Sequence, residues 1–386
     1  MSSGLSRVVR AVPPSKIREM FTAAEAYPRA ISLGIGEPDF PTPEPVVRAA
    51  LADALAGHTH YTASQGDPEL RAALAAHLSP RYGVELTPDD VLITTGGMGA
   101  LTAFFRAVCD PGDEVILPEP CFPAYRAMIE FAGGRVVHAH TRLEDGFVLQ
   151  PRAVEAALGP RSKVLLLNSP NNPTGAMIPP ATLDRLAELA LAHDLVVVSD
   201  EVYDRIVFGQ VPHQSIYTRP GMAERTCVVG SFSKGFAMTG WRLGWAFGPR
   251  WLLEGMLKVA TFYTSCPSSV SQRAALAALA QPDSTYGRMV EAFRRRRDMA
   301  VAMLRQVPGV RVEPPPGSFY LFPHLGEIGD DTERFARQLL QREQVVVIPG
   351  GAFGPSGERC IRLALTVDRA RLKDALTRLC RFLRRG

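Results

Sequence analysis

Lysine is scarce in this sequence of 386 residues. Of the 43 basic residues, only five are lysines and the other 38 are arginines; the lysines are Lys16, Lys163, Lys234, Lys258 and Lys373. An arginine side chain stays protonated in proteins, so it is a poor amine nucleophile. Any chemistry that requires a reactive amine must therefore draw on one of five side chains.

Several other features are also missing. No run of 18 apolar residues occurs, so we expect no transmembrane helix, and the polar segment Met1–Arg10 has no signal-peptide core. The six cysteines form no Cys-x-x-Cys pair, which is typical of reduced thiols in a cytoplasmic protein. His58 and His60 have no Cys or carboxylate at ligand spacing, so we predict no metal site. A net charge of +4 gives no reason to expect a nucleic-acid partner.

Apolar runs alternate with helical patterns through the middle of the chain. This alternation predicts an α/β fold with a mostly parallel sheet and helices on both faces. The expected strands are residues 91–95, 114–117, 136–139, 163–168, 195–199 and 226–230.

The last third of the chain has a different pattern. A long helix rich in arginine follows residue 281, and short strands are expected near residues 319–322, 345–348 and 359–365, before a final amphipathic helix. We therefore predict a large domain over residues 46–283 and a smaller α+β domain over 284–386. Residues 1–45 are expected to form an N-terminal arm and part of the small domain. The run Arg294–Arg297 is either a phosphate-binding patch or a solvated helix face, and the second interpretation is favoured.

Polar side chains follow four of the expected strands. Ligands of an open α/β sheet bind beyond the carboxyl ends of its parallel strands, so these groups should converge on one pocket. The glycine turn 96–99 opens a helix and offers backbone N–H groups to an anion. The other groups are Asn172, Asp200, Tyr203, Ser231, Ser233 and Lys234, with Arg242 eight residues further on.

Each of these groups has a role in binding one particular ligand. The glycine turn and Arg242 suit a phosphate, Asp200 a cationic ring nitrogen, and Asn172 and Tyr203 a ring oxygen. Lys234 suits an aldehyde, with which it would form a Schiff base. A phosphate, a pyridinium, a phenolate oxygen and an aldehyde together describe pyridoxal 5′-phosphate.

Motifs along nearly the whole chain resemble the class I aminotransferases, which are fold type I enzymes that use pyridoxal phosphate. The resemblance implies their fold, a large domain with a mostly parallel sheet between helices and a smaller α+β domain. The matching segments are Ser32–Phe40, Tyr61 with Gly66–Arg71, Asn168–Gly175, Ser199–Tyr203, Ser231–Lys234, Gly240–Gly244, Gly317–Tyr320 and Ile361–Leu363.

The resemblance implies a role for each matching residue. Lys234 would bind the cofactor covalently and then move a proton at the substrate α-carbon, and Asp200 would keep the ring nitrogen protonated. Arg362 would hold the substrate α-carboxylate, assisted by Asn172 and the backbone of Gly36. The remaining cofactor contacts would be Tyr203 and Asn172 at the ring oxygen, Phe122 on the ring face, and Gly97, Met98, Ser231, Ser233 and Arg242 at the phosphate. Tyr61 would reach the phosphate of the neighbouring subunit, which implies a homodimer.

These motifs indicate the substrate less clearly than they indicate the cofactor. The sequences of residues 32–40 and 236–244 resemble those of both aromatic and aspartate aminotransferases. Aromatic side chains near the expected pocket favour an aromatic or neutral amino donor with 2-oxoglutarate as the acceptor; they are Phe21, Phe122, Tyr125, Phe262 and Tyr263.

Three other classes of protein share some of these features. A lyase that cleaves carbon–sulfur bonds uses the same scaffold and the same cofactor. A nicotinamide-dependent dehydrogenase would use the turn 95–99 for its dinucleotide and Glu119 for the ribose. A regulator that binds pyridoxal phosphate would need a DNA-binding domain, and too few residues precede Ser32 to hold one.

Overall fold

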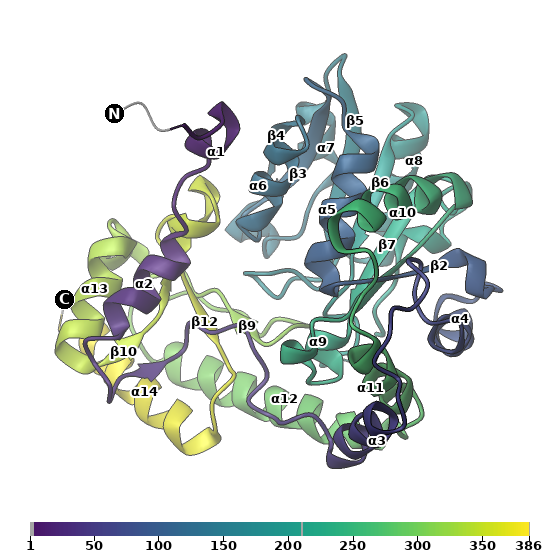
Figure 1. Cartoon of the computed structure of the whole chain (residues 1–386). Coiled ribbons are helices and arrows are strands. Elements are labelled where there is room, and N and C mark those ends of the chain that lie inside the picture. Colours follow the sequence, from purple (N-terminus) through teal and green to yellow (C-terminus); the bar gives the residue numbers. More distant parts are fainter. Residues whose placement is uncertain (1–3, 210, 386) are drawn as a thin grey trace.

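The computed structural model describes residues 4–209 and 211–385. Its centre is a seven-stranded sheet in the order β2-β8-β7-β6-β5-β3-β4, with helices on both faces (Figure 1). The strands are β2 (Val91–Thr94), β3 (Glu114–Glu119), β4 (Arg135–His140), β5 (Ser162–Asn168), β6 (Val196–Asp200), β7 (Thr226–Ser231) and β8 (Gly244–Phe247). The α/β fold with a mostly parallel sheet is therefore confirmed.

One strand of this sheet was not predicted. Residues 244–247 form β8, which runs antiparallel between β2 and β7. Its four residues are all buried, so they show no alternation of polar and apolar side chains. For that reason the sequence indicates a cofactor-binding motif beside these residues but no strand.

Apolar side chains pack on both faces of the sheet. In β5, Val164 and Leu166 face one core, whereas Leu165 and Leu167 face another, because successive side chains of a strand point to opposite faces. The first core is completed by α5 (Gly96–Val108), α6 (Ala124–Phe131) and α10 (Arg250–Thr264). The second is completed by α7 (Pro151–Ala157) and α8 (Pro180–Ala192). A third cluster joins β2 and β8 to α3 (Glu44–Leu55), α4 (Pro68–Tyr82) and α11 (Ser269–Leu279).

A separate hydrophobic core joins the two ends of the chain. Met20, Ile31 and Leu33 from the first 45 residues pack among apolar side chains of the last hundred. The first of these segments holds α1 (Arg7–Ala11), α2 (Lys16–Ala24) and β1 (Ile31–Ser32). The second holds α12 (Ser284–Leu304), β9 (Tyr320–Leu321), α13 (Thr332–Glu343), β10 (Val345–Val346), β11 (Ile348–Pro349), β12 (Ile361–Ala364) and α14 (Arg369–Leu383).

The expected strand at 345–348 is divided in two. β10 pairs in parallel with β1, and β11 pairs antiparallel with β12. The N-terminal segment thus supplies a strand and two helices, which its sequence pattern did not show. Figure 1 shows α12 running between this smaller unit and the large sheet.

The interpretation of Arg294–Arg297 as a solvated helix face is wrong for two of its residues. The side chain of Arg296 is only 8% exposed, and it makes a bidentate ion pair with Asp39 at 2.7 and 2.9 Å. The Arg297 side chain is 11% exposed and donates to the carbonyl of Pro315 at 3.0 Å. These arginines anchor α12 to the N-terminal segment and to the loop before β9.

Three general properties of the described residues concern membrane-spanning helices, metal sites and cysteines. None of their helices combines the length and the apolar content needed to cross a membrane. Within residues 4–209 and 211–385, no group of three or more His, Cys, Asp or Glu side chains is arranged to hold a metal ion. The six cysteines are free thiols, and five of them are buried.

Candidate active site

A cavity of about 290 Å³ lies beyond the carboxyl ends of the parallel strands. It brings together nearly all of the side chains predicted to act there. These are Gly36, Gly97, Met98, Phe122, Asn172, Asp200, Tyr203, Ser231, Ser233, Lys234, Arg242 and Arg362. Tyr61 is the exception, since it is 90% exposed and does not line the cavity within the single chain.

One end of the cavity is suited to a phosphate. Helix α5 begins at Gly96, directly after β2, and the preceding Thr95 makes no capping hydrogen bond with its side chain. The first N–H groups of a helix have no partner within the helix, so an anion can accept from them. Arg242 approaches this turn so closely that a Cβ atom on Gly96, where φ is +76°, would lie 2.9 Å from its Nη2. The glycine therefore leaves room for a guanidinium group beside the helix start.

Asp200 lines the same cavity at the end of β6. It is 4% exposed, its Oδ2 accepts from the hydroxyl of Tyr125 at 2.7 Å, and its Oδ1 accepts from the amide of Val202 at 3.2 Å. Burial raises the pKa of Asp200 to about 6. A buried carboxylate with this proton affinity is stabilised by a neighbouring cationic ring nitrogen.

Lys234 is part of α9 (Phe232–Gly235), which follows β7. Its Nζ donates a hydrogen bond to the carbonyl of Gly36 at 2.6 Å. Burial lowers the pKa of Lys234 to about 8, and the positive charges of Arg362 and Arg242 act in the same direction. The amine can therefore lose its proton close to neutral pH, as covalent chemistry requires.

If Lys234 binds pyridoxal phosphate covalently, its lowered pKa predicts how the rate of cofactor capture depends on pH. Only the neutral amine attacks an aldehyde, so the capture rate should rise with pH and level off above pH 8. At pH 7 about a tenth of this amine is neutral, about 300 times the fraction of an ordinary lysine. Stopped-flow absorbance after mixing apoprotein with pyridoxal phosphate measures the rate. A rate that rises without a plateau up to pH 10 would contradict a lowered pKa for the amine that captures the cofactor.

Arg362 on β12 provides a second anion site in the cavity. Its side chain is buried, its Nη1 donates to Oδ1 of Asn172 at 3.0 Å, and its Nη2 donates to the carbonyl of Gly34 at 2.6 Å. Its Nε is buried and has no hydrogen-bond partner among the described residues. The guanidinium carbon lies 4.4 Å from the ring centroid of Tyr320. The group is thus held in a fixed orientation that suits a carboxylate.

Some contacts in the cavity were not predicted from the sequence. Tyr125 lines the cavity, as expected, but its hydrogen bond to Asp200 was not predicted. The hydroxyl of Tyr320 lies 3.3 Å from that of Tyr203. Ile17 and Ile35 enter from the N-terminal segment, together with the expected Phe21. Contacts between segments so distant in the chain have no periodicity that a sequence could display.

Two aromatic side chains expected near the pocket lie elsewhere. Phe262 on α10 is 91% exposed, and Tyr263 lines a different cavity with Thr95 and Met98. Neither lines the cavity that contains Lys234.

The residues present fit pyridoxal phosphate. The uncapped start of α5 with Arg242 fits its phosphate, the buried Asp200 fits its ring nitrogen, and the partly buried amine of Lys234, with its lowered pKa, fits its aldehyde. All of them line one cavity.

Comparison with known proteins identifies the family. The family model described as "Aminotransferase class I and II" matches residues 28–379. The aspartate/prephenate aminotransferase of Thermus thermophilus is 39% identical over 99% of this chain and 100% of its own. The aromatic-amino-acid aminotransferase 2 of Thermococcus litoralis is 36% identical over 98% of each chain. The structure of the Thermus thermophilus aspartate aminotransferase with maleate superposes with a TM-score of 0.93 at 39% identity, over 98% of this chain and 99% of that one.

The comparisons favour neither the lyase nor the dehydrogenase alternative. The chain belongs to the class I and II aminotransferases, enzymes that use pyridoxal 5′-phosphate to move an amino group from an amino acid to a 2-oxo acid.

Proposed function

We propose that Lys234 is the residue that binds the cofactor covalently and moves the proton at the substrate α-carbon. The observation that carries this proposal is an amine in the cavity wall whose pKa is lowered to about 8 by burial and by the charges of Arg362 and Arg242. When bound, pyridoxal phosphate supplies a ring that accepts electrons from the α-carbon. Asp200 keeps a proton on the ring nitrogen, and Tyr203 and Asn172 bind the ring oxygen. Arg362 binds the substrate α-carboxylate.

The other predicted contacts have supporting geometry. Ser231 and Ser233 lie next to Lys234 and line the same cavity, where they bind the phosphate together with the amides of Gly97 and Met98. Phe122 also lines the cavity, where its ring lies nearly perpendicular to that of Tyr125 with 5.6 Å between ring centroids, and we propose that it packs on the cofactor ring.

We propose an amino donor with an aromatic or neutral side chain. The cavity contains three cationic side chains, Lys234, Arg242 and Arg362, and each already has a role above. The rest of its wall includes apolar groups: Ile17, Phe21, Ile35, Met98, Leu101 and Phe122. A second carboxylate on the substrate would be desolvated against these side chains without an ion-pair partner, which is unfavourable.

A panel of amino donors tests the substrate proposal. Phenylalanine, tyrosine and leucine should convert the bound cofactor in the half-reaction with a kcat/KM at least about tenfold above that of aspartate, because the missing cation leaves the second carboxylate unpaired. Loss of the visible cofactor band measures each half-reaction. A preference for aspartate and glutamate would refute the proposal and leave the assignment of Lys234 intact.

We also propose a homodimer in which Tyr61 reaches the phosphate of the neighbouring site. Tyr61 is 90% exposed, and Leu55, Phe262 and Tyr263 are exposed apolar side chains on α3 and α10. Exposed groups of this kind are typical of a surface that another subunit covers. The cytoplasmic location and the domain division at residues 45 and 283 stay predictions.

A further inference from the structure

Glu201 immediately follows Asp200 but contacts a different set of residues. Asp200 lines the active-site cavity, whereas Glu201 does not. Ser199 precedes Asp200, and its hydroxyl donates to Oε1 of Glu201 at 2.6 Å. Alternate residues at the end of a strand point to the same side, so Ser199 and Glu201 form a pair behind Asp200.

The carboxylate of Glu201 has four donors. Its Oε1 accepts from Ser199 and from Ser215 at 2.5 Å, and its Oε2 accepts from Tyr82 at 2.9 Å and from His213 Nε2 at 2.7 Å. Glu201 is only 1% exposed. A buried carboxylate is tolerated only where hydrogen bonds or an opposite charge replace its hydration. These four donors therefore hold the group in one position.

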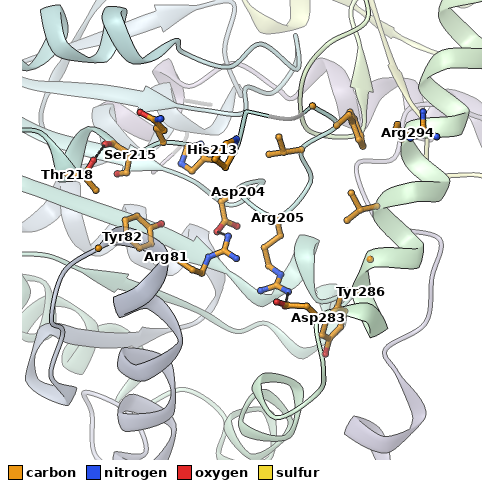
Figure 2. Close-up of a pocket in the computed structure, with 18 of the residues that line it drawn as sticks. Arg81, Tyr82, Asp204, Arg205, His213, Ser215, Thr218, Asp283, Tyr286 and Arg294 are labelled. Carbon is orange, nitrogen blue, oxygen red and sulfur yellow. Dashed lines mark hydrogen bonds and ion pairs between the residues drawn. The ribbon is translucent and has the colours of Figure 1, made fainter.

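His213 links this carboxylate to a second cavity. Its side chain is 8% exposed and forms part of the wall of a cleft of about 920 Å³ (Figure 2). Figure 2 shows Tyr82 and Ser215 at the same end of the cleft, and Arg81 with Asp204 beside them. In the described part of the chain, no residue hydrogen-bonds His213 Nδ1. The Nδ1 atom is itself buried, so His213 is held to this network through its Nε2 contact with Glu201.

His213 and Glu201 each favour the charged form of the other. Burial opposes the charge on His213, but Glu201 outweighs burial and raises the pKa of His213. Burial likewise opposes the charge on Glu201, but His213 lowers its pKa. Asp204 also raises the pKa of His213, and Arg81 lowers it. Each partner therefore stabilises the charged form of the other.

Two connections link Glu201 to Asp200. The amide of Glu201 donates to the carbonyl of Val229 on β7 at 2.9 Å, which fixes the backbone where β6 ends. The negative charge of Glu201 also adds to burial in raising the pKa of Asp200. The backbone hydrogen bond and the side chain held by four donors together fix residue 201 beside Asp200, and the charge of Glu201 contributes to the proton affinity of Asp200.

We propose that Glu201 is a positioning residue for Asp200, held in place by Tyr82 and His213, and that it thereby keeps the cofactor ring nitrogen protonated. The inference rests on the role proposed above for Asp200. Glu201 touches neither substrate nor cofactor, so it acts through the orientation and the negative potential of Asp200.

The variant Glu201→Gln tests this inference, because glutamine keeps the shape and loses the charge. Loaded with ¹⁵N-labelled pyridoxal phosphate, it should show a ring-nitrogen chemical shift displaced toward the unprotonated value. Its kcat should fall about tenfold or more, as expected for the loss of a charged hydrogen-bonded group. The KM for the amino donor should stay within about twofold, because Arg362 is unchanged.

Milder variants keep the test decisive if Glu201→Gln does not fold. Ser215→Ala and Tyr82→Phe each remove one neutral donor to Glu201 and should displace the ¹⁵N shift in the same direction by a smaller amount. Glu291→Gln is the matched control, since Glu291 lines the same cleft and pairs with Arg294 and Arg295. It should leave shift and kcat unchanged.

Asp200→Asn separates the positioning role of Glu201 from the role of Asp200 itself. If it displaces the ¹⁵N shift while Glu201→Gln, or Tyr82→Phe in its place, leaves both shift and kcat at the native values, the positioning role is refuted and the role of Asp200 stands. If Asp200→Asn has no effect on the ¹⁵N shift, the proposed roles of Asp200 and Glu201 are both refuted.

Discussion

Lys234→Ala is expected to lose amino transfer by about 10⁴-fold or more, since the variant lacks both the nucleophile and the proton carrier. The purified variant should also lack the visible band that an imine of pyridoxal phosphate with a lysine produces. The fold should persist, because alanine removes a buried amine whose charge is opposed by burial. Single-turnover absorbance with an amino donor measures the loss.

Lys373→Ala is the matched control for this experiment. Lys373 is an exposed residue on α14 and lies outside the active-site cavity. Its replacement should leave both the band and the rate unchanged. If Lys234→Ala retained both the band and the rate, Lys234 would have no part in the mechanism.

Asp200→Asn is expected to lower kcat by about 10³-fold. Asparagine matches the shape of aspartate but cannot carry the negative charge that stabilises a protonated ring nitrogen, and charge stabilisation of this kind is worth about 10²–10³ in rate. The affinity for pyridoxal phosphate should also fall, because the ring loses its ion-pair partner. Steady-state kinetics at saturating cofactor, with a cofactor titration of the apoprotein, measures both effects.

Asp184→Asn serves as the comparison for Asp200→Asn. Asp184 on α8 pairs with Arg219, and its side chain is 60% exposed, so its replacement should change neither kcat nor cofactor affinity. Equal rates for Asp200→Asn and the native enzyme would show that the ring nitrogen needs no carboxylate.

Much of the site could be predicted because its functional side chains come directly after the ends of strands. Asp200 and Lys234 each follow a run of buried apolar residues, and parallel strands place their ends at one edge. Tyr125 could not be assigned in the same way. Its hydrogen bond to Asp200 joins residues 75 positions apart, and its place on an apolar helix face resembles that of any core aromatic.

Parts of the fold could not be predicted for a similar reason. The strand β1 is two residues long, and its pairing with β10 depends on a partner more than 300 positions away. Arg296 lies in a run of four arginines that looks like an exposed helix face, yet Asp39 and the carbonyl of Leu365 bury it. A pattern confined to one segment cannot show which distant residue will satisfy a charge.

One lysine among five carries the proposed chemistry. Reduction of the native holoenzyme with borohydride, followed by peptide mass spectrometry, fixes the cofactor to the residue that binds it. We expect the reduced pyridoxyl phosphate group on Lys234 alone. Finding the group on Lys16, Lys163, Lys258 or Lys373, or on no lysine, would contradict the role proposed for Lys234.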